Sequence, residues 1–437
     1  MKNKSLYFFI ILLTACTFGK KNNLQNRAFI DSKKIKKVQV IFKIYNNSRT
    51  TSILYCKIRT ANLLSLFSSK EKQNKINYTL EGKVYLVGVD SPVDSFSISK
   101  EIAIDTMNKI TEKINLQCKE KEKYIIEISL IDHHKVSTTK HSINIDRAVI
   151  NKNDYLILNK KNKLKFSSYF NTSDTLFIQN NTNQKTLFVK YYKEKFPLAQ
   201  PPFLVEKIKS KKIKAENIFL IPTDTTLFLF PINKIGIYQI LDKEEAENGM
   251  SILSFDNDFP KINTAKNMIL PLQYICTNEE FSKLQEAKNP KIAIDEFWLA
   301  RTKDDKDQAK KLIYTFYKRA EYSNAFFTSY KAGWKTDRGM IMIVFGAPNI
   351  IYQSKEGESW IYGEKNNMYA LNFTFTKIKN KFSDNDFQLN RSAYFKNIWN
   401  IAQESWREGH AYSDMDIKKK IYEQERRERQ SQLYFWY

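Results

Sequence analysis

The fold of the C-terminal part of the chain is decided by one stretch, Gly333-Trp334-Lys335-Thr336-Asp337-Arg338-Gly339. Apolar residues precede this stretch at helical spacing: Ala309, Leu312, Ile313, Phe316, Tyr317 and Ala320. Their period predicts a long amphipathic helix whose apolar stripe faces a protein core. The apolar run Met340 to Phe345 follows the stretch and is predicted to be a strand. We therefore interpret residues 333–339 as a helix-to-strand turn.

Most residues of this turn have an expected structural role. Gly333 is placed to end the helix in a left-handed conformation, and the large ring of Trp334 is expected to be buried. The short oxygens of Thr336 and Asp337 can bond nearby backbone N–H groups and fix the turn. These roles predict that the stretch stabilises the domain.

Arg338 and Gly339 complete the turn. Arg338 is predicted to pair with Asp337 or with an acid on the long helix, such as Glu321. Gly339 would let the chain enter the strand without a side-chain clash. The functional alternative places Asp337 and Arg338 in a ligand or partner site at the helix-to-strand junction.

Helix signals surround the turn. Thr277 and Glu280 form a capping box, Asn289-Pro290 opens another helix, and Asp304-Asp305 begins the long one. Phe395 to Trp406 carries apolar residues on one helical face, and strands are predicted at 360–363 and 371–375. We predict an α+β domain over residues 275–437, with a C-terminal helix and an aromatic tail.

The region before residue 275 has the pattern of a β-protein. Short β-branched and aromatic runs alternate with turn residues, which is typical of antiparallel sandwiches. We predict two β-sandwich-like domains, at residues 35–150 and 151–274, so that the whole chain is multidomain. Pro197, Pro201 and Pro202 mark a loop in the second of them.

The first residues resemble a bacterial lipoprotein signal peptide. Lys2 and Lys4 precede a short apolar run, which ends in the lipobox-like Leu13-Thr14-Ala15-Cys16. We predict a signal peptide at 1–15, acylation of Cys16, and a tether at 16–34. Thr17 after the cysteine favours the outer membrane, facing the periplasm, by resemblance to lipoprotein sorting; the cell surface is the alternative.

Composition limits the partners. The formal net charge is +24, but the many lysines are scattered through every segment, which does not favour nucleic-acid binding. The expected partners are the membrane, through the lipid, and an envelope protein. Cys56, Cys118 and Cys276 remain besides Cys16, and either a Cys56–Cys118 disulfide or three reduced thiols is possible from their spacing.

Catalytic signatures are missing from the sequence. We find no nucleophile elbow, no zinc-protease helix and no glycine-rich phosphate loop, so we predict no catalytic residue, no cofactor and no metal. His133, His134 and His141 lie around one predicted hairpin, but adjacent histidines on a strand face opposite sides. The alternative is a hydrolase of cell-wall glycan or peptide, acting through carboxylates such as Glu296, Glu321 and Asp337.

The turn and its surroundings resemble the GWxTD domain family of bacterial envelope proteins. Besides residues 333–339, the likeness rests on Phe297-Trp298, Phe345-Gly346-Ala347-Pro348 and Trp360-Ile361-Tyr362-Gly363, and it spans about residues 275–410. The resemblance implies a C-terminal domain behind β-rich modules on a secreted or lipid-anchored chain, with no established activity. The expected function is a non-catalytic scaffold or protein-interaction module at the periplasmic face of the outer membrane.

The chain closes on an aromatic cluster, Leu433-Tyr434-Phe435-Trp436-Tyr437. These rings are expected either to fold back onto the C-terminal domain or to form an exposed patch for a partner or a membrane surface.

Overall fold

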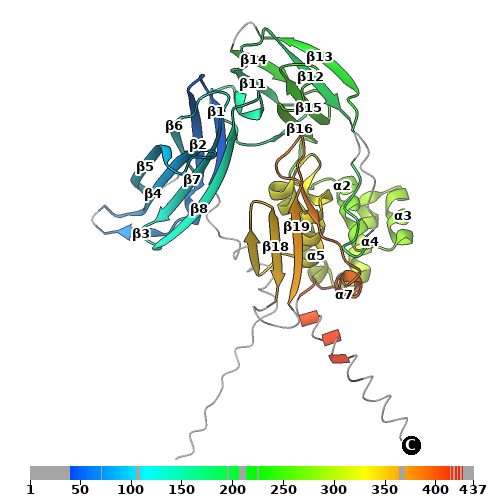
Figure 1. Cartoon of the computed structure of the whole chain (residues 1–437). Coiled ribbons are helices and arrows are strands. Elements are labelled where there is room, and N and C mark those ends of the chain that lie inside the picture. Colours follow the sequence, from blue (N-terminus) through cyan, green and yellow to red (C-terminus); the bar gives the residue numbers. More distant parts are fainter. Residues whose placement is uncertain are drawn as a thin grey trace, which may run out of the picture.

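The computed structural model describes residues 40–426, except residues 70, 105–108, 194–195, 206–212, 224–225, 364–369, 414, 417–418, 421 and 424–425. The predicted signal peptide, Cys16, the tether and the aromatic tail lie outside the described residues. Figure 1 shows two β-rich modules followed by a mixed α/β region. The chain is therefore multidomain, with β-structure first and an α+β domain last, as the sequence predicts.

The first module consists of two antiparallel sheets. One has the order β1-β2-β6, and in the other β3, β4, β7 and β8 follow one another while β5 pairs with β4. The strands are β1 (Val40–Asn46), β2 (Thr51–Arg59), β3 (Ser65–Ser68), β4 (Gln73–Leu86), β5 (Pro92–Ala103), β6 (Lys109–Gln117), β7 (Lys123–Asp132) and β8 (Ser137–Asp146), with a short 3-10 turn η2 (Thr60–Asn62). Strict alternation of buried and exposed residues in β6 gives the core Ile110, Ile114 and Leu116.

The second module also has two sheets, of orders β10-β16-β15-β12-β13 and β14-β11-β9. The elements are η3 (Lys152–Asp154), β9 (Tyr155–Leu158), β10 (Tyr169–Asn171), β11 (Thr175–Asn180), β12 (Thr186–Tyr192), β13 (Asn217–Pro222), β14 (Leu227–Pro231), β15 (Gly236–Leu241) and β16 (Met250–Phe255). All pairs are antiparallel except β10 with β16. Leu176, Val189 and Ile240 lie in the core between the sheets.

The C-terminal domain packs helices against a four-stranded antiparallel sheet of order β17-β18-β19-β20. Its elements are α2 (Ala265–Ile269), η4 (Leu270–Tyr274), α3 (Asn278–Glu286), α4 (Pro290–Arg301), α5 (Lys306–Phe327), η5 (Gly333–Lys335), α6 (Asp337–Phe345), β17 (Ile350–Gln353), β18 (Gly357–Tyr362), β19 (Leu371–Lys377), β20 (Phe387–Leu389) and α7 (Phe395–Arg407). Trp406 meets Trp298 and Phe316 edge to face in the core, and the rings of Trp298 and Phe316 are tilted against each other at 5.4 Å between centroids.

The predicted helix starts are confirmed. Thr277 and Glu280 form the capping box of α3, with both reciprocal hydrogen bonds present. Asn289 caps α4, and Asp305 accepts the N–H groups of Asp307 and Gln308 at the start of α5. Short polar side chains therefore fix these three boundaries.

The strand predicted at Met340 to Phe345 is wrong, because this run belongs to helix α6. Thr336 caps the helix, Asp337 supplies negative charge in its first turn, and every residue from Arg338 to Phe345 is buried. A helix buried on all sides has no polar face, so its sequence lacks the period that separates a helix from a buried strand.

The helix ending predicted at Gly333 is also wrong. Helix α5 ends at Phe327, and Gly333 opens the 3-10 turn η5, which follows Ala332 and carries Trp334. Gly333 is not among the described glycines with positive φ. The turn therefore joins two helices that pack against each other.

The three regions touch through buried side chains. Tyr45 and Ile53 of the first module pack against Leu156 and Leu158 of the second. Asn46 donates its side-chain N–H to Asp154 at 2.9 Å across the same junction. Phe382 of the C-terminal domain packs against β12, β15 and β16 of the second module.

Cys56, Cys118 and Cys276 are free thiols. Burial raises the pKa of each to about 12, so all three stay protonated at neutral pH. Within the described ranges, no helix has the length and apolar character needed to cross a membrane.

Candidate functional site

The turn from Gly333 to Gly339 forms where α5 and α6 cross. Thr336 accepts the backbone N–H of Gly339 at 3.1 Å and donates its hydroxyl to the carbonyl of Gly333 at 2.7 Å. A Cβ at Gly339 would lie 1.9 Å from the Gly333 carbonyl oxygen, and a Cβ at Gly333 would lie 1.8 Å from the Ser323 carbonyl oxygen. Both glycines are therefore required by close backbone approach, and not by a left-handed conformation or by entry into a strand.

Trp334 is buried as predicted, with 7% of its surface exposed. Its backbone N–H donates to the side-chain oxygen of Asn324 at 3.1 Å, and its carbonyl accepts the hydroxyl of Tyr274 at 3.1 Å. Asn324 also donates to the carbonyl of Pro260 at 3.0 Å. The turn is thereby tied both to α5 and to the segment that follows β16.

Asp337 forms an ion pair with Arg391, a residue that the sequence analysis did not single out. Arg391 binds both carboxylate oxygens of Asp337, with N–O distances of 2.6 and 3.1 Å, and the N–H of Leu389 donates to the same carboxylate at 2.8 Å. Only 11% of the Asp337 side chain and 14% of the Arg391 side chain are exposed. Asp337 therefore connects the start of α6 to the end of β20.

The same ion pair reaches the second β module. Arg391 donates to the carbonyl of Gln200 at 3.0 Å, in the proline-rich loop between β12 and β13. The N–H of Ala199 donates to the carbonyl of Lys335 at 3.0 Å, and the N–H of Ser392 donates to the carbonyl of Pro202 at 3.1 Å. The loop marked by its prolines thus lies directly on the turn.

Arg338 pairs with Glu358 at 3.2 Å, so both partners expected from the sequence, Asp337 and Glu321, are wrong. Glu358 lies on β18, 20 residues further along the chain, and this long-range contact has no signal in the local sequence. The guanidinium also donates to the carbonyl of Asn385 at 3.0 Å and stacks 3.9 Å from the ring centroid of Phe387. Arg338 therefore joins α6 to the sheet and to the segment before β20.

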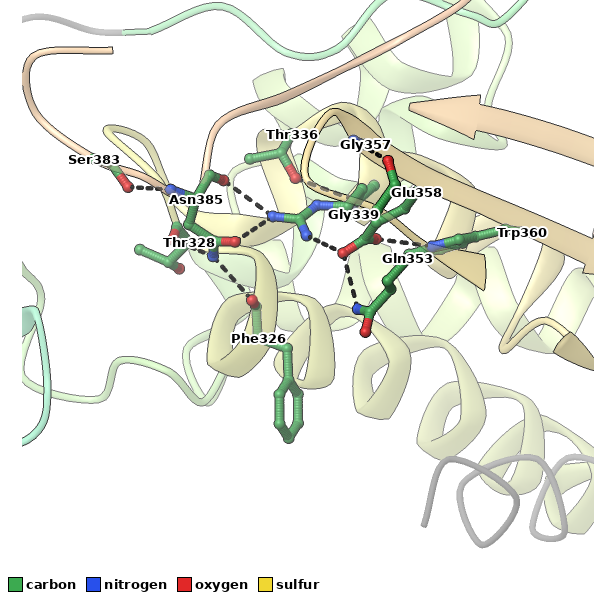
Figure 2. Close-up of polar contacts among 12 residues, drawn as sticks. Phe326, Thr328, Thr336, Gly339, Gln353, Gly357, Glu358, Trp360, Ser383 and Asn385 are labelled. Atoms are coloured by element: carbon green, nitrogen blue, oxygen red, sulfur yellow. Dashed lines mark hydrogen bonds and ion pairs between the residues drawn. The ribbon is translucent and has the colours of Figure 1, made fainter. Parts of the chain in front are cut away.

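Figure 2 shows how this second network is completed. Glu358 accepts the indole N–H of Trp360 at 3.0 Å and the side-chain N–H of Gln353 at 3.2 Å. Asn385 donates to the carbonyls of Phe326 and Thr328 at 3.0 and 2.9 Å. Arg338 thus connects two hydrogen-bonded groups, Glu358 with its donors on the sheet and Asn385 with the carbonyls at the C-terminal end of α5.

Burial dominates the electrostatics here. It lowers the pKa of Arg338 to about 10, although Glu358 acts in the opposite direction, so the guanidinium stays charged at neutral pH. Burial also raises the pKa of Asp386 and lowers that of Lys331, both close to Asp337. The charges of Asp337 and Arg338 themselves are balanced by ion pairs within the domain.

The three carboxylates singled out from the sequence have separate surroundings. Glu296 is exposed on α4, whereas Glu321 on α5 pairs with Lys318 at 3.1 Å and accepts the N–H of Ile262 at 3.4 Å. Asp337 is engaged by Arg391. The structure does not bring these acids together around one of the pockets it describes.

The histidines are likewise in separate contacts. His133 hydrogen-bonds with Thr79 at 2.7 Å, His134 contacts the carbonyl of Leu64, and the ring of His141 lies edge-on against Phe42. In the part of the chain that the structure describes, no cluster of three or more His, Cys, Asp or Glu residues is placed to hold a metal ion.

A pocket of about 230 Å³ adjoins the turn, between the end of β16 and α5. Its walls include Phe196, Phe255, Phe259, Tyr330 and Trp334, with Lys331 and Asp258 also lining it. Phe255 and Phe259 stack at 4.1 Å between centroids. The lining offers aromatic surface and charges of both signs.

Comparison with known families identifies this region. The GWxTD domain family matches residues 236–408, from the start of β15 to just beyond α7. The match begins earlier than the resemblance read from the motifs, because it includes β15 and β16 of the second module. No curated protein matches the chain. The signature turn, its two ion pairs and nearly all of the aromatic pocket fall within the matched residues, and this part of the chain is therefore similar to the GWxTD domain family.

Proposed function

We propose that this protein is a non-catalytic scaffold of the bacterial cell envelope. Acylated Cys16 would hold it at the periplasmic face of the outer membrane, the β modules would act as spacers, and the GWxTD domain would bind a protein partner. The observation that carries the proposal is the internal neutralisation of both charged signature residues, Asp337 by Arg391 and Arg338 by Glu358.

An internally paired charge favours a structural role over a chemical one. Both carboxylate oxygens of Asp337 are occupied by Arg391, and one of them also accepts the N–H of Leu389. Breaking a buried ion pair leaves an uncompensated charge, so these residues serve the domain best when they remain paired. The signature then acts as a clamp that holds α6, the sheet and the proline-rich loop in one arrangement.

The hydrolase alternative requires a different arrangement. Glycan cleavage needs two carboxylates that flank the scissile bond, about 5 to 9.5 Å apart, in a cleft open to substrate. Glu321 and Asp337 instead pair with basic residues, Lys318 and Arg391. The contacts of these acids therefore support the scaffold reading over the enzyme reading.

The anchor has its own test. Cys16→Ser should abolish acylation and release the protein from the membrane fraction, because the acyl chains provide the binding energy. Continued co-sedimentation with the outer membrane in high salt would contradict a lipid anchor at Cys16.

The scaffold role is tested by deletion and complementation. Gentle extraction of the anchored chain should recover one stoichiometric envelope protein, and a folded Asp337→Asn variant should complement a deletion fully. A monodisperse chain without a partner would count against the scaffold. Loss of function in a folded Asp337→Asn protein would favour the enzyme.

A further inference from the structure

Strand β13 exposes an apolar edge on the second module. Its sequence from Asn217 to Pro222 contains no charged residue, and Ile218, Phe219 and Leu220 are 48%, 40% and 57% exposed. Among the described strands, β13 pairs only with β12, and it forms the end of its sheet. Figure 1 places it at the top of the molecule, away from the α/β region. Exposed apolar edges of this kind tend to pair with other chains unless they are protected.

One side of the β13 backbone faces no other strand in the part of the chain that the structure describes. Thr223 donates its N–H to the carbonyl of Lys185 on the β12 side, at 2.8 Å. Hydrogen bonding alternates along an antiparallel strand, so, counted back from Thr223, the peptide groups of Leu220 and Ile218 point away from β12. The alternation ends before Glu216, whose N–H donates to the carbonyl of Tyr191 on β12 at 2.8 Å. Pro222, two residues after Leu220, also directs its backbone away from β12. Its missing N–H therefore removes no hydrogen bond to β12.

We propose that β13 binds an extended peptide segment of a partner protein, which adds as a further strand to the β13 edge. The segment would be apolar at alternate positions and acidic at its ends. This surface lies on the module that the proposed function treats as a spacer, and the inference does not depend on the lipid anchor.

The acidic ends follow from the charges beside the strand. Lys185 lies near the Pro222 end of β13, and Lys193 and Lys214 lie near the Asn217 end. All three lysines are exposed, as is Glu216 at the Asn217 end. If two copies of the chain paired through β13 in antiparallel fashion, Lys185 of one copy would lie close to Lys193 and Lys214 of the other. Like charges facing each other across strands are destabilising, and the net charge of +24 adds to this repulsion.

A lipid surface fits the edge less well than a peptide does. Exposed leucine and isoleucine flanked by lysines would suit a membrane, but the outward peptide groups of β13 would then lose their hydrogen bonds to water. A peptide strand satisfies those groups while covering the apolar side chains.

The test uses the full chain in detergent and three synthetic peptides. The first alternates valine and threonine with aspartates at both ends, the second has lysines in place of the aspartates, and the third is the first with N-methylated backbone on alternate residues. Fluorescence anisotropy should show binding of the first. The second and third should bind at least about tenfold more weakly, because charge attraction or edge hydrogen bonds are removed.

Two variants at one position locate the site. Leu220→Pro removes an outward N–H and should weaken binding of the acidic peptide about tenfold, whereas Leu220→Thr keeps that N–H and should retain most of it. If Leu220→Pro lowers the melting temperature, the N-methylated peptide on the unaltered chain decides the question alone.

Several outcomes would overturn the inference. They are the failure of the acidic peptide to bind, equal binding of the N-methylated peptide, and a folded Leu220→Pro chain that binds as before. A concentration-dependent dimer in sedimentation, or binding to phosphatidylglycerol vesicles, without peptide binding would assign the edge to a second copy or to a membrane instead. None of these results alters the test of Cys16 or of Asp337.

Discussion

The signature turn and the edge of β13 place polar and apolar groups in opposite ways. Asp337 and Arg338 are charged but buried, and each is neutralised within the domain. Ile218 and Leu220 are apolar but exposed, on a strand with one strand neighbour among the described residues. Residue type alone would assign binding to the first region and core packing to the second. Contacts and burial reverse that assignment, so we infer that the charged turn stabilises the domain and that the apolar strand binds.

The largest effect should come from Trp334→Ala. Removing a buried aromatic ring costs about 3–5 kcal/mol, because a cavity remains and the contact with Tyr274 is lost. Thermal unfolding followed by tryptophan fluorescence should show early melting of the GWxTD domain, with far-UV signals of the β modules retained. Protease resistance equal to that of the unaltered chain would mean that Trp334 contributes little to stability.

Asp337→Asn should have the next largest effect. The change removes a charge from a largely buried ion pair with Arg391, and we expect a loss of about 2 kcal/mol in the free energy of unfolding. Chemical denaturation measures this loss. Glu296→Gln, at an exposed position on α4, is the matched control and should change stability by less than about 0.5 kcal/mol.

A smaller effect is expected from Thr336→Ala. The hydroxyl caps α6 by accepting the N–H of Gly339, and losing such a cap costs about 1 kcal/mol. Thr336→Ser keeps the oxygen and should recover most of the loss. Equal destabilisation by both substitutions would assign the effect to packing of the methyl group.

The smallest effect is expected from Leu220→Thr. The side chain is exposed and threonine suits a strand, so the free energy of unfolding should change by less than about 0.5 kcal/mol. Chemical denaturation measures this change. A large loss of stability would show that Leu220 belongs to the structural core, and the contrast between the two regions would fail.

Local signals in the sequence predicted much of the fold. Caps at Thr277, Asn289 and Asp305 act within a few residues, and so they are readable without a structure. The stripe of α5 is similarly local, because one face of this helix is exposed. Helix α6 has no exposed face, so its sequence shows no helical alternation of apolar and polar residues from which it could be predicted.

The partners within the candidate site were not predictable in the same way. Arg391 lies 54 residues from Asp337, and Glu358 lies 20 residues from Arg338. Such pairs depend on how the sheet packs against α6, which no local pattern encodes. The solvent exposure of β13 could not be predicted for a similar reason. An apolar run is expected to lie in the core until its neighbours in the fold are known.

The central claim is that the signature turn is an internal clamp, and a double-mutant cycle tests it most directly. The cycle combines Asp337→Asn with Arg391→Gln and measures the free energy of unfolding of the GWxTD domain for all four proteins. The account predicts a coupling energy of about 2 kcal/mol, because either single change already breaks the ion pair. Effects that add within about 0.5 kcal/mol would show that the two residues do not stabilise the domain through each other, and would contradict the account.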